Sequence, residues 1–422
     1  MPTFLHAADL HIDSPLRGLE SRFEGAQPAA FAETVRQATR RALTRLVDTA
    51  IERQVAFVAL AGDVVDGDAT LHTALFLSRQ FARLRDAGIP VFAALGNHDC
   101  AGLMPAHLAP MDGVHVFARD RAETLDCRGV ALHGRSYPVW DLRTDIAADY
   151  PQAVRGCLNV GVLHTALTGA DEHDPYAPTT PQVLAAKGYG YWALGHVHKR
   201  ADTLVVDGSR IVFPGNLQGR SIRETGPKGC VLVHYEGAAV SGVEFVPCDV
   251  VRWHFVEVDA ASTAEQTQAL MAQQVLDATA PDRQAGRACA VRVRVTGAHP
   301  DAAAWRGARG EWRENLAFRL HDSPDLVIEK LDLAVQDAQA ADTAQLQGAR
   351  ALLQQAVAQL ALQPEDLRAL FAPLRRQLSE CGLNEAEWRR HFGDVVPLQG
   401  QPVDAPALLQ RGLDAISARM GG

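Results

Sequence analysis

Short apolar runs alternate with stretches of helical periodicity over the first 250 residues. Residues 3–8 are apolar, and apolar positions between 31 and 50 recur at the three- and four-residue spacing of a helix. The run 55–61 ends in Gly-Asp, a second helical pattern covers 73–87, and a buried strand is predicted over 90–95. This β-α-β-α-β order predicts a layered α/β domain. Further strands are predicted over 114–118, 130–132, 158–163, 191–194, 210–213 and 230–235.

The pattern changes near residue 250. A strand is predicted over 251–258, a helix over 263–277, and an alternating, half-buried strand over 290–296. These elements favour a small α+β domain. Beyond it the chain is rich in Ala, Gln and Leu at helical spacing. We therefore predict three parts: an α/β domain over 1–250, an α+β domain over 251–340, and a helical region over 341–422.

Composition narrows the class of protein. The chain has 422 residues, of which 47% are hydrophobic and 22% charged, so we expect a globular protein of two or three domains. Seven cysteines without a C-x-x-C pair predict reduced thiols rather than a thiolate zinc site. Without a signal-like start or an 18-residue apolar run, we expect a cytoplasmic protein that does not enter the membrane. The net charge of −9 weighs against non-specific nucleic-acid binding.

Five short polar motifs stand at the ends of predicted strands. Sites in layered α/β sheets form at the carboxyl ends of strands, where loops converge, so these motifs are expected to meet. In chain order they are Asp9-Leu-His11, Gly62-Asp63-Val-Val-Asp66, Gly96-Asn97-His98-Asp99, His164 and Gly195-His196-Val-His198.

Local geometry supports the same expectation. Residues i and i+2 of an extended segment face one side, so Asp9 with His11, and His196 with His198, should each point a pair of side chains into one crevice. A glycine precedes three of the motifs, and we expect each glycine to let the backbone turn sharply.

The chemistry of the motifs indicates a metal site. Carboxylates, imidazoles and one amide oxygen, without thiolates, suit Mn²⁺, Fe or Zn²⁺. Seven such groups fit two ions that share a carboxylate, an arrangement used for phosphoryl transfer. A single histidine would indicate little, but five ordered motifs favour a site over chance. The candidate ligands are Asp9, His11, Asp63, Asn97, His164, His196 and His198.

This series resembles the signature of the calcineurin-like metallophosphoesterases. Further segments resemble the YhaO-type bacterial DNA repair exonucleases, relatives of the SbcD nuclease subunit: Phe4-Leu-His-Ala-Ala-Asp-Leu-His-Ile-Asp-Ser-Pro-Leu16, Asp174-Pro-Tyr-Ala-Pro178, Tyr191-Trp-Ala-Leu-Gly-His-Val-His-Lys199 and Phe213-Pro-Gly-Asn-Leu-Gln-Gly-Arg220. The resemblance covers about residues 3–235 and is only architectural after 250. It implies a β-sandwich flanked by helices, a small α+β capping domain beside the DNA groove, and a C-terminal helical region.

The resemblance also implies roles for individual residues. Two divalent ions, with Mn²⁺ preferred, would share Asp63. His98 would lie over the scissile phosphate and protonate or stabilise the leaving oxygen, and Asp99 would orient His98. The first ion would be held by Asp9, His11, Asp63 and His198, and the second by Asp63, Asn97, His164 and His196.

Two features stay open at this point. Close SbcD-like nucleases often carry histidine where this chain has Asp66, so Asp66 either supports the ligands from behind or caps a loop or helix. The segment 219–229 contains Arg220, Arg223 and Lys228, which would grip the phosphates flanking the cut, or belong to a polar hairpin with glycine turns.

Three functions are compared. The first is a two-metal DNA exonuclease of DNA repair, working with an SMC-type coiled-coil ATPase and as a homodimer. The second is a small-molecule or cyclic-nucleotide phosphodiesterase, or a protein phosphatase, of the same superfamily. The third is a non-catalytic scaffold, which would predict loss of a ligand or of His98. The roughly 170-residue extension and the YhaO-like segments favour the first.

Overall fold

The computed structural model describes residues 1–17, 19, 29–66, 70–100, 112–167, 176–201 and 203–338. The helical region expected over 341–422 lies outside the described residues. The chain divides into two compact units, each described by itself. The larger unit comprises Met1–Val258, Gln268–Arg294 and Gly310–Asp332, and the smaller comprises Asp259–Thr267, Val295–Arg309 and Leu333–Gly422.

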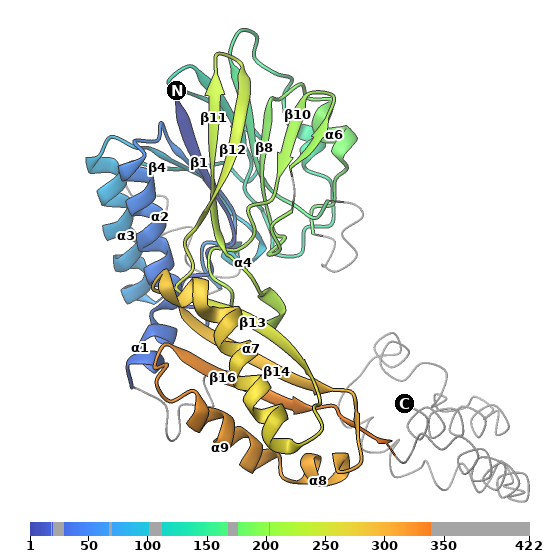
Figure 1. Ribbon diagram of the computed structural model, residues 1–422. Coiled ribbons are helices and arrows are strands. Elements are labelled where there is room, and N and C mark those ends of the chain that lie inside the picture. The colour runs from blue at the N-terminus through green and yellow to red at the C-terminus, as the bar shows by residue number, and fades with distance from the viewer. Residues whose placement is uncertain are drawn as a thin grey trace, which may run out of the picture. The chain divides into compact units, whose positions relative to one another are not determined.

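Two six-stranded sheets form the body of the larger unit (Figure 1). Strands β1 to β4 of the first sheet run parallel, and β11 joins β1 in the antiparallel sense. The first sheet has the order β12 (Ala239–Pro247), β11 (Gly229–Glu236), β1 (Thr3–Ala7), β2 (Val58–Ala61), β3 (Val91–Ala94) and β4 (Val114–Val116). The second has the order β5 (Glu123–Cys127), β6 (Val130–Gly134), β7 (Leu158–His164), β8 (Tyr191–Gly195), β10 (Ser209–Val212) and β9 (Leu204–Val206).

The sheets pack face to face. Phe4 of β1 stacks on Phe57 with ring centroids 4.7 Å apart, and meets Tyr191 of β8 edge-on at 5.3 Å. Leu5 and Ala7 point to the opposite face of the same strand, into a second core cluster. Burial on both faces explains why these strands read as continuous apolar runs instead of alternating. The predicted layered α/β fold is confirmed.

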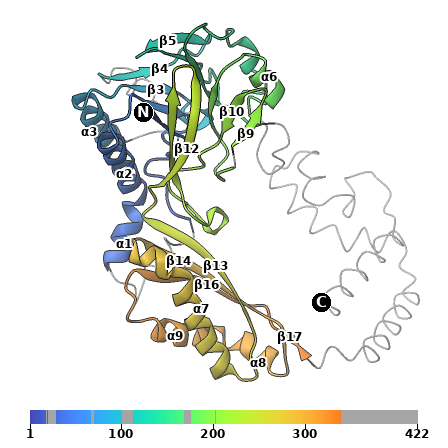
Figure 2. The same cartoon turned by 45° about the horizontal axis from the view of Figure 1, so that its top comes forward.

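Helices cover the outer face of the first sheet (Figures 1 and 2). Leu43 and Leu77, one from each long helix, pack with Leu5 in that second cluster. The helical pattern over 31–50 is interrupted at Gln37 (φ −96°, ψ 3°), a break that the spacing of apolar residues does not reveal. The helices are α1 (Ala29–Arg36), α2 (Ala38–Glu52) and α3 (Leu71–Asp86), with the short turns α4 (Asn97–Cys100), η2 (Ala147–Asp149), α6 (Pro181–Ala185) and η3 (Ile222–Glu224).

A three-stranded sheet follows after residue 250. Val291, Val293 and Val295 are buried, whereas Arg292 is half-buried and Arg294 exposed, which confirms the predicted half-buried strand. Trp253 packs in a cluster that also contains residues of the N-terminal segment. The sheet has the order β13 (Val251–Asp259), β14 (Ala288–Thr296) and β16 (Leu326–Leu333), accompanied by α7 (Ala264–Gln284) and α9 (Arg309–Arg319).

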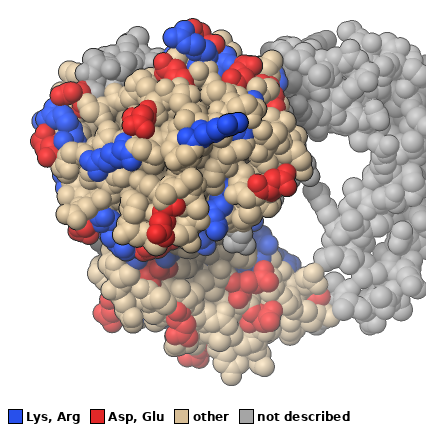
Figure 3. Space-filling model, turned by 90° about the horizontal axis from the view of Figure 1, so that it is seen from above, with Lys and Arg blue, Asp and Glu red and all other residues tan. Residues whose placement is uncertain are grey.

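The smaller unit contains a parallel strand pair, β15 (Ala298–His299) with β17 (Gln336–Asp337), and helix α8 (Ala302–Gly307). Trp305 of α8 is buried and stacks on His299 at a centroid distance of 4.0 Å. Among the helices that the structure describes, none combines the length and apolar character needed to cross a membrane. On the face of the molecule shown in Figure 3, acidic and basic side chains are interspersed, so the net charge of −9 is not gathered into one patch there.

Candidate active site

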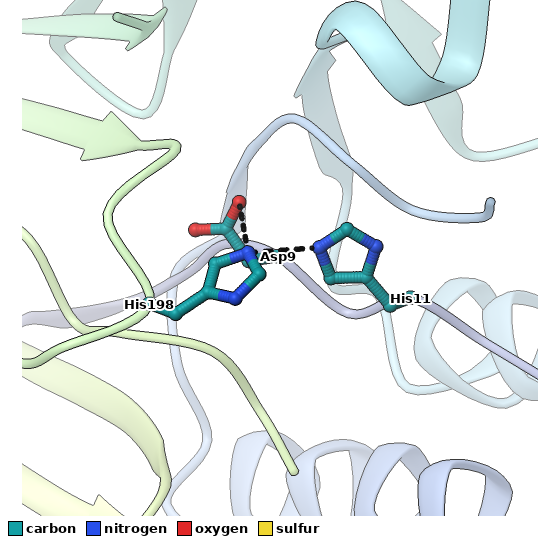
Figure 4. A group of neighbouring side chains, drawn as sticks. All are labelled: Asp9, His11 and His198. Atoms are coloured by element: carbon teal, nitrogen blue, oxygen red, sulfur yellow. Dashed lines mark hydrogen bonds and ion pairs between the residues drawn. The ribbon is translucent and has the colours of Figure 1, made fainter. Parts of the chain in front are cut away.

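The polar motifs converge where strands of the two sheets end. Figure 4 shows Asp9, His11 and His198, which come from loops after β1 and β8. The Nε2 atoms of His11 and His198 lie 3.1 Å apart, and His198 Nε2 lies 3.9 Å from Asp9 Oδ1. Two imidazole nitrogens aimed at each other beside a carboxylate form a group that could hold one metal ion.

A second group lies directly beside the first. It contains Asp9, Asp63 and His164, from the ends of β1, β2 and β7. Asp63 Oδ2 is 3.4 Å from His164 Nε2 and 3.8 Å from His11 Nε2, so it faces ligands of both groups. This is the position expected of a carboxylate shared by two ions.

The remaining candidate ligands join the second group. Asn97 Oδ1 lies 3.0 Å from His164 Nε2. The ring of His196 lies 5.2 Å from the ring of His164, and the main-chain N–H of His196 donates to both oxygens of Asp9 at 3.0 and 3.1 Å. The structure therefore brings all seven candidate ligands together.

Three of the histidines are oriented from behind. His11 Nδ1 lies 2.5 Å from Asp66 Oδ1, and His164 Nδ1 lies 2.9 Å from the carbonyl oxygen of Ala61. His198 Nδ1 lies 2.7 Å from Glu224 Oε1. With Nδ1 donating, each ring presents the lone pair of Nε2 to the site. Metal-binding histidines are commonly fixed in this way, because the second partner sets both tautomer and ring orientation.

The electrostatics of the site also fit divalent cations. Burial lowers the pKa of His11 to about 4 and that of His164 to about 3, so both rings are neutral, as ligands must be. Burial, reinforced by the neighbouring charge of Asp63, raises the pKa of Asp9 well above its ordinary value. Two adjacent buried carboxylates are costly unless a positive charge compensates them, and divalent ions would supply that charge.

Backbone conformation, not strand alternation, aims several ligands. The expectation that Asp9 and His11 share a side because they are extended is wrong: β1 ends at Ala7, and the two residues have φ values of 52° and 43°. Asp63 (φ 52°) and His196 (φ 100°) also lie at positive φ. Such values are uncommon for residues other than glycine and are tolerated where the surrounding contacts enforce them, often at functional sites.

The expectation that all three glycines before the motifs allow a sharp turn is wrong for two of them. Only Gly62 has the positive φ of a sharp turn, at 86°. A Cβ at Gly96 would lie 2.3 Å from Asp63 Oδ1, and one at Gly195 would lie 1.8 Å from the carbonyl oxygen of Ala61. These two glycines leave room for a ligand and for the neighbouring strand.

His98 lies at the open side of the site with 46% of its side chain exposed. Its Nδ1 is 3.1 Å from Asp66 Oδ1, and this hydrogen bond raises the pKa of His98. Asp99, predicted to orient His98, is buried and instead accepts hydrogen bonds from the main-chain N–H groups of Val64 (2.8 Å) and Gly96 (3.0 Å). Asp66 therefore occupies the place beside His98, and Asp99 ties two ligand loops together.

The three predicted phosphate-binding cations lie in different surroundings. Arg220 Nη1 donates to Asp66 Oδ2 at 2.9 Å and to Ser14 Oγ at 3.0 Å, at the edge of the site. Arg223 is exposed on η3. Lys228 is 5% exposed, and its ammonium group donates to the carbonyl of His198 at 2.8 Å. Lys228 therefore supports the loop that carries His198 from the interior of the protein, whereas Arg223 faces solvent.

Glu224 is a site residue that the sequence analysis missed. Besides contacting His198, it accepts hydrogen bonds from the main-chain N–H of Arg220 at 2.6 Å and from Asn216 Nδ2 at 2.9 Å. Although burial opposes it, the hydrogen bond from His198 lowers the pKa of Glu224 to about 2. The signal in the sequence was that Glu224 is the acidic residue of the segment 219–229, whose arginines and lysine were interpreted as phosphate-binding residues.

Replacing Glu224 with glutamine is expected to weaken metal binding by about 10- to 100-fold, because the ring of His198 loses its charged partner. Titration of the metal-free protein with Mn²⁺, followed by calorimetry, measures this change. The exposed Glu236→Gln variant is the matched control and should bind like the unchanged protein. Equal affinities for both variants would show that Glu224 does not support the ligand.

Comparison with known families agrees with this geometry. The profile of the calcineurin-like phosphoesterases matches residues 2–200. The profile of the middle domain of metallophosphoesterase YhaO matches residues 253–336, the segment that contains β13, β14 and β16.

Relatives along the chain are found in bacteria and archaea. Metallophosphoesterase YhaO of Bacillus subtilis (strain 168) is 35% identical over 305 residues, which are 71% of this chain and 72% of that protein. The DNA double-strand break repair protein Mre11 of Methanopyrus kandleri is 25% identical over 57% of this chain and 56% of its own length. Mre11 of Saccharolobus solfataricus is 28% identical over 41% of this chain and 46% of its own length. The extent of the first match, together with both profiles, places this chain in the calcineurin-like metallophosphoesterases, hydrolases of phosphoester bonds, within the YhaO group.

Proposed function

We propose that this protein is a two-metal DNA exonuclease that hydrolyses phosphodiester bonds in DNA repair. The observation that carries the proposal is the convergence of seven donor groups beside the exposed, Asp66-paired His98. The similarity to proteins named for DNA double-strand break repair supports DNA as the substrate.

Two divalent cations, which we propose to be Mn²⁺, would supply Lewis-acid chemistry to a phosphodiester when bound. The residues present fit them in type, number and orientation. As the family resemblance implies, Asp9, His11, Asp63 and His198 would hold one ion, and Asp63, Asn97, His164 and His196 the other. Asp9 also lies close to Asp63 and His164.

The side chains around the ligands would divide the remaining work. His98 is accessible and carries a raised pKa, so it can donate a proton from Nε2 to the leaving oxygen. Asp66 fixes the ring through Nδ1 and stabilises its charged form. Although burial opposes it, hydrogen bonds from His11 and His98 lower the pKa of Asp66 and keep its carboxylate ionised, and Arg220 holds that carboxylate in place from the other side.

The wider assembly is part of the proposal. Residues 251–340 would act as a cap beside the DNA, and residues 341–422, outside the described residues, would dock an SMC-type coiled-coil ATPase. We also propose a homodimer in the cytoplasm. These statements rest on the resemblance to the SbcD-like nucleases.

The proposal is tested with end-labelled single-stranded and duplex DNA in the presence of Mn²⁺, with bis-p-nitrophenyl phosphate alongside. We expect stepwise shortening of DNA, abolished by a chelator and restored by metal. Cleavage of the small diester alone, also after addition of a partner ATPase, would instead favour a small-molecule phosphodiesterase. Metal binding without cleavage of either substrate would favour a scaffold.

A further inference from the structure

An exposed aromatic surface lies next to the metal ligands. Trp140 has 58% of its surface exposed, and its neighbour Val139 has 53%. The ring of Trp140 lies 6.2 Å from that of Tyr176, and Tyr176 in turn meets the ring of the ligand His196 edge-on at 5.7 Å. Two ring contacts therefore lead from solvent to the metal site.

This surface is fixed to the site by its backbone. The main-chain N–H of Ala177 donates to the carbonyl of Leu142 at 2.6 Å, which joins the segments carrying Tyr176 and Trp140. Thr165 Oγ1 donates to the carbonyl of Ala177 at 2.6 Å, and Thr165 directly follows a ligand in the sequence. The position of Tyr176 is thus coupled to the loop after β7.

Arg143 completes the support. Its guanidinium lies over the ring of Tyr176 at 4.7 Å and its Nε donates to Asp141 at 2.5 Å. A cation above the ring and an imidazole at its edge hold Tyr176, which is itself only 9% exposed. Trp140 is left as the aromatic side chain of this group that presents itself to solvent.

Single exposed apolar side chains are common and need no explanation by themselves. Trp140 differs because it continues a row of rings that ends on a metal ligand. A flat, accessible indole offers the stacking surface that nucleobases use, and stacking needs a base that is not already paired within a duplex.

We propose that Trp140 stacks on an unpaired nucleobase of the strand being cut, so that the adjacent phosphate is presented to the metal site. This inference deepens the proposed function and rests on it. It assigns the substrate as a single-stranded or frayed DNA end, and it makes Trp140 a residue that sets specificity.

Binding of dye-labelled single strands tests the proposal, using protein that also carries His98→Ala so that no strand is cut. Fluorescence anisotropy should show that Trp140→Ala weakens binding by roughly 5- to 100-fold, the range for loss of one stacked base, while Trp140→Phe keeps most of the affinity. Val139→Ala, at the equally exposed neighbour, is the matched control and should bind as before. Metal content is measured for every variant to establish that the site is intact.

Strands with one abasic residue separate stacking from contacts to the backbone. Moving the abasic residue along the strand should locate one position at which the missing base lowers the affinity of protein that keeps Trp140. At that position the missing base should not lower the affinity of the Trp140→Ala variant any further. Cutting is measured separately, on protein that keeps His98. If Trp140→Ala binds normal and abasic strands as tightly as the control, the inference is overturned, while shortening of DNA by protein with His98 would still uphold the exonuclease. If DNA is bound through Trp140 but is never cut by protein with His98, the exonuclease proposal fails and the stacking surface stands. If DNA is neither bound nor cut, both fail.

Discussion

Replacing Asp63 with asparagine is expected to lower phosphodiester hydrolysis by about a thousandfold or more. Asp63 Oδ2 faces His164 and His11, which belong to different metal groups, so loss of its charge weakens both. A metal ion contributes several kcal/mol of charge stabilisation in the transition state, and each 1.36 kcal/mol corresponds to a tenfold change in rate. Asparagine keeps the oxygen that accepts a hydrogen bond from the N–H of His98 at 3.0 Å, so the loop should stay in place.

Thermal unfolding tests the same substitution in a second way, because the variant that loses activity is expected to gain stability when metal is absent. In chelator, the Asp63→Asn variant should be more stable than the unchanged protein, because Asp9 no longer has a second buried carboxylate beside it. Added Mn²⁺ should raise the unfolding temperature of the unchanged protein more than that of the variant. The exposed Asp126→Asn variant serves as control. Equal stabilisation by metal in both Asp63 forms would contradict a shared carboxylate.

Replacing His98 with alanine is expected to lower kcat by about 10²- to 10⁴-fold, the usual contribution of a positioned acid or base. The variant should keep both metal ions, because His98 is not one of the seven candidate ligands. The measurements are steady-state kinetics and metal content on the same protein samples. His72→Ala, at an exposed position on α3, controls for the loss of an imidazole.

The metal content decides between two arrangements. His98, Asp66 and His11 also lie close enough together to hold an ion. If His98→Ala loses one equivalent of metal along with activity, His98 is a ligand and not the proton donor. Retained metal with lost turnover supports the donor.

The convergence of the candidate ligands could be predicted from the sequence because each motif follows a buried apolar run. A run such as residues 58–61 reports where a strand ends, and the polar residues after it must lie at the edge of the sheet. The direction in which each ligand points could not be predicted, because apolar spacing reports burial and not φ. Asp9 and His11 converge because their backbone is in the left-handed region, which their residue types alone do not predict.

The partners of the ligands were harder to predict than the ligands. His198 and Glu224 are 26 residues apart and meet only because the chain returns to the site after β10. Asp66 lies three residues after the candidate ligand Asp63, and Asp99 directly follows His98, yet only Asp66 faces His98. Which carboxylate contacts which histidine depends on distances in the folded protein, and the local sequence does not predict them.

The order of strands in the first sheet also constrains how the protein is made. Strand β1 lies between β2 and β11, so its second neighbour is synthesised about 170 residues after its first. At 5–20 residues per second, a ribosome needs roughly ten to thirty seconds to cover that stretch. During this time the strand that leads to Asp9 and His11 has an open edge, which can pair with other chains. We therefore expect nascent chains that stop before β11 to depend on chaperones and to lack the metal site.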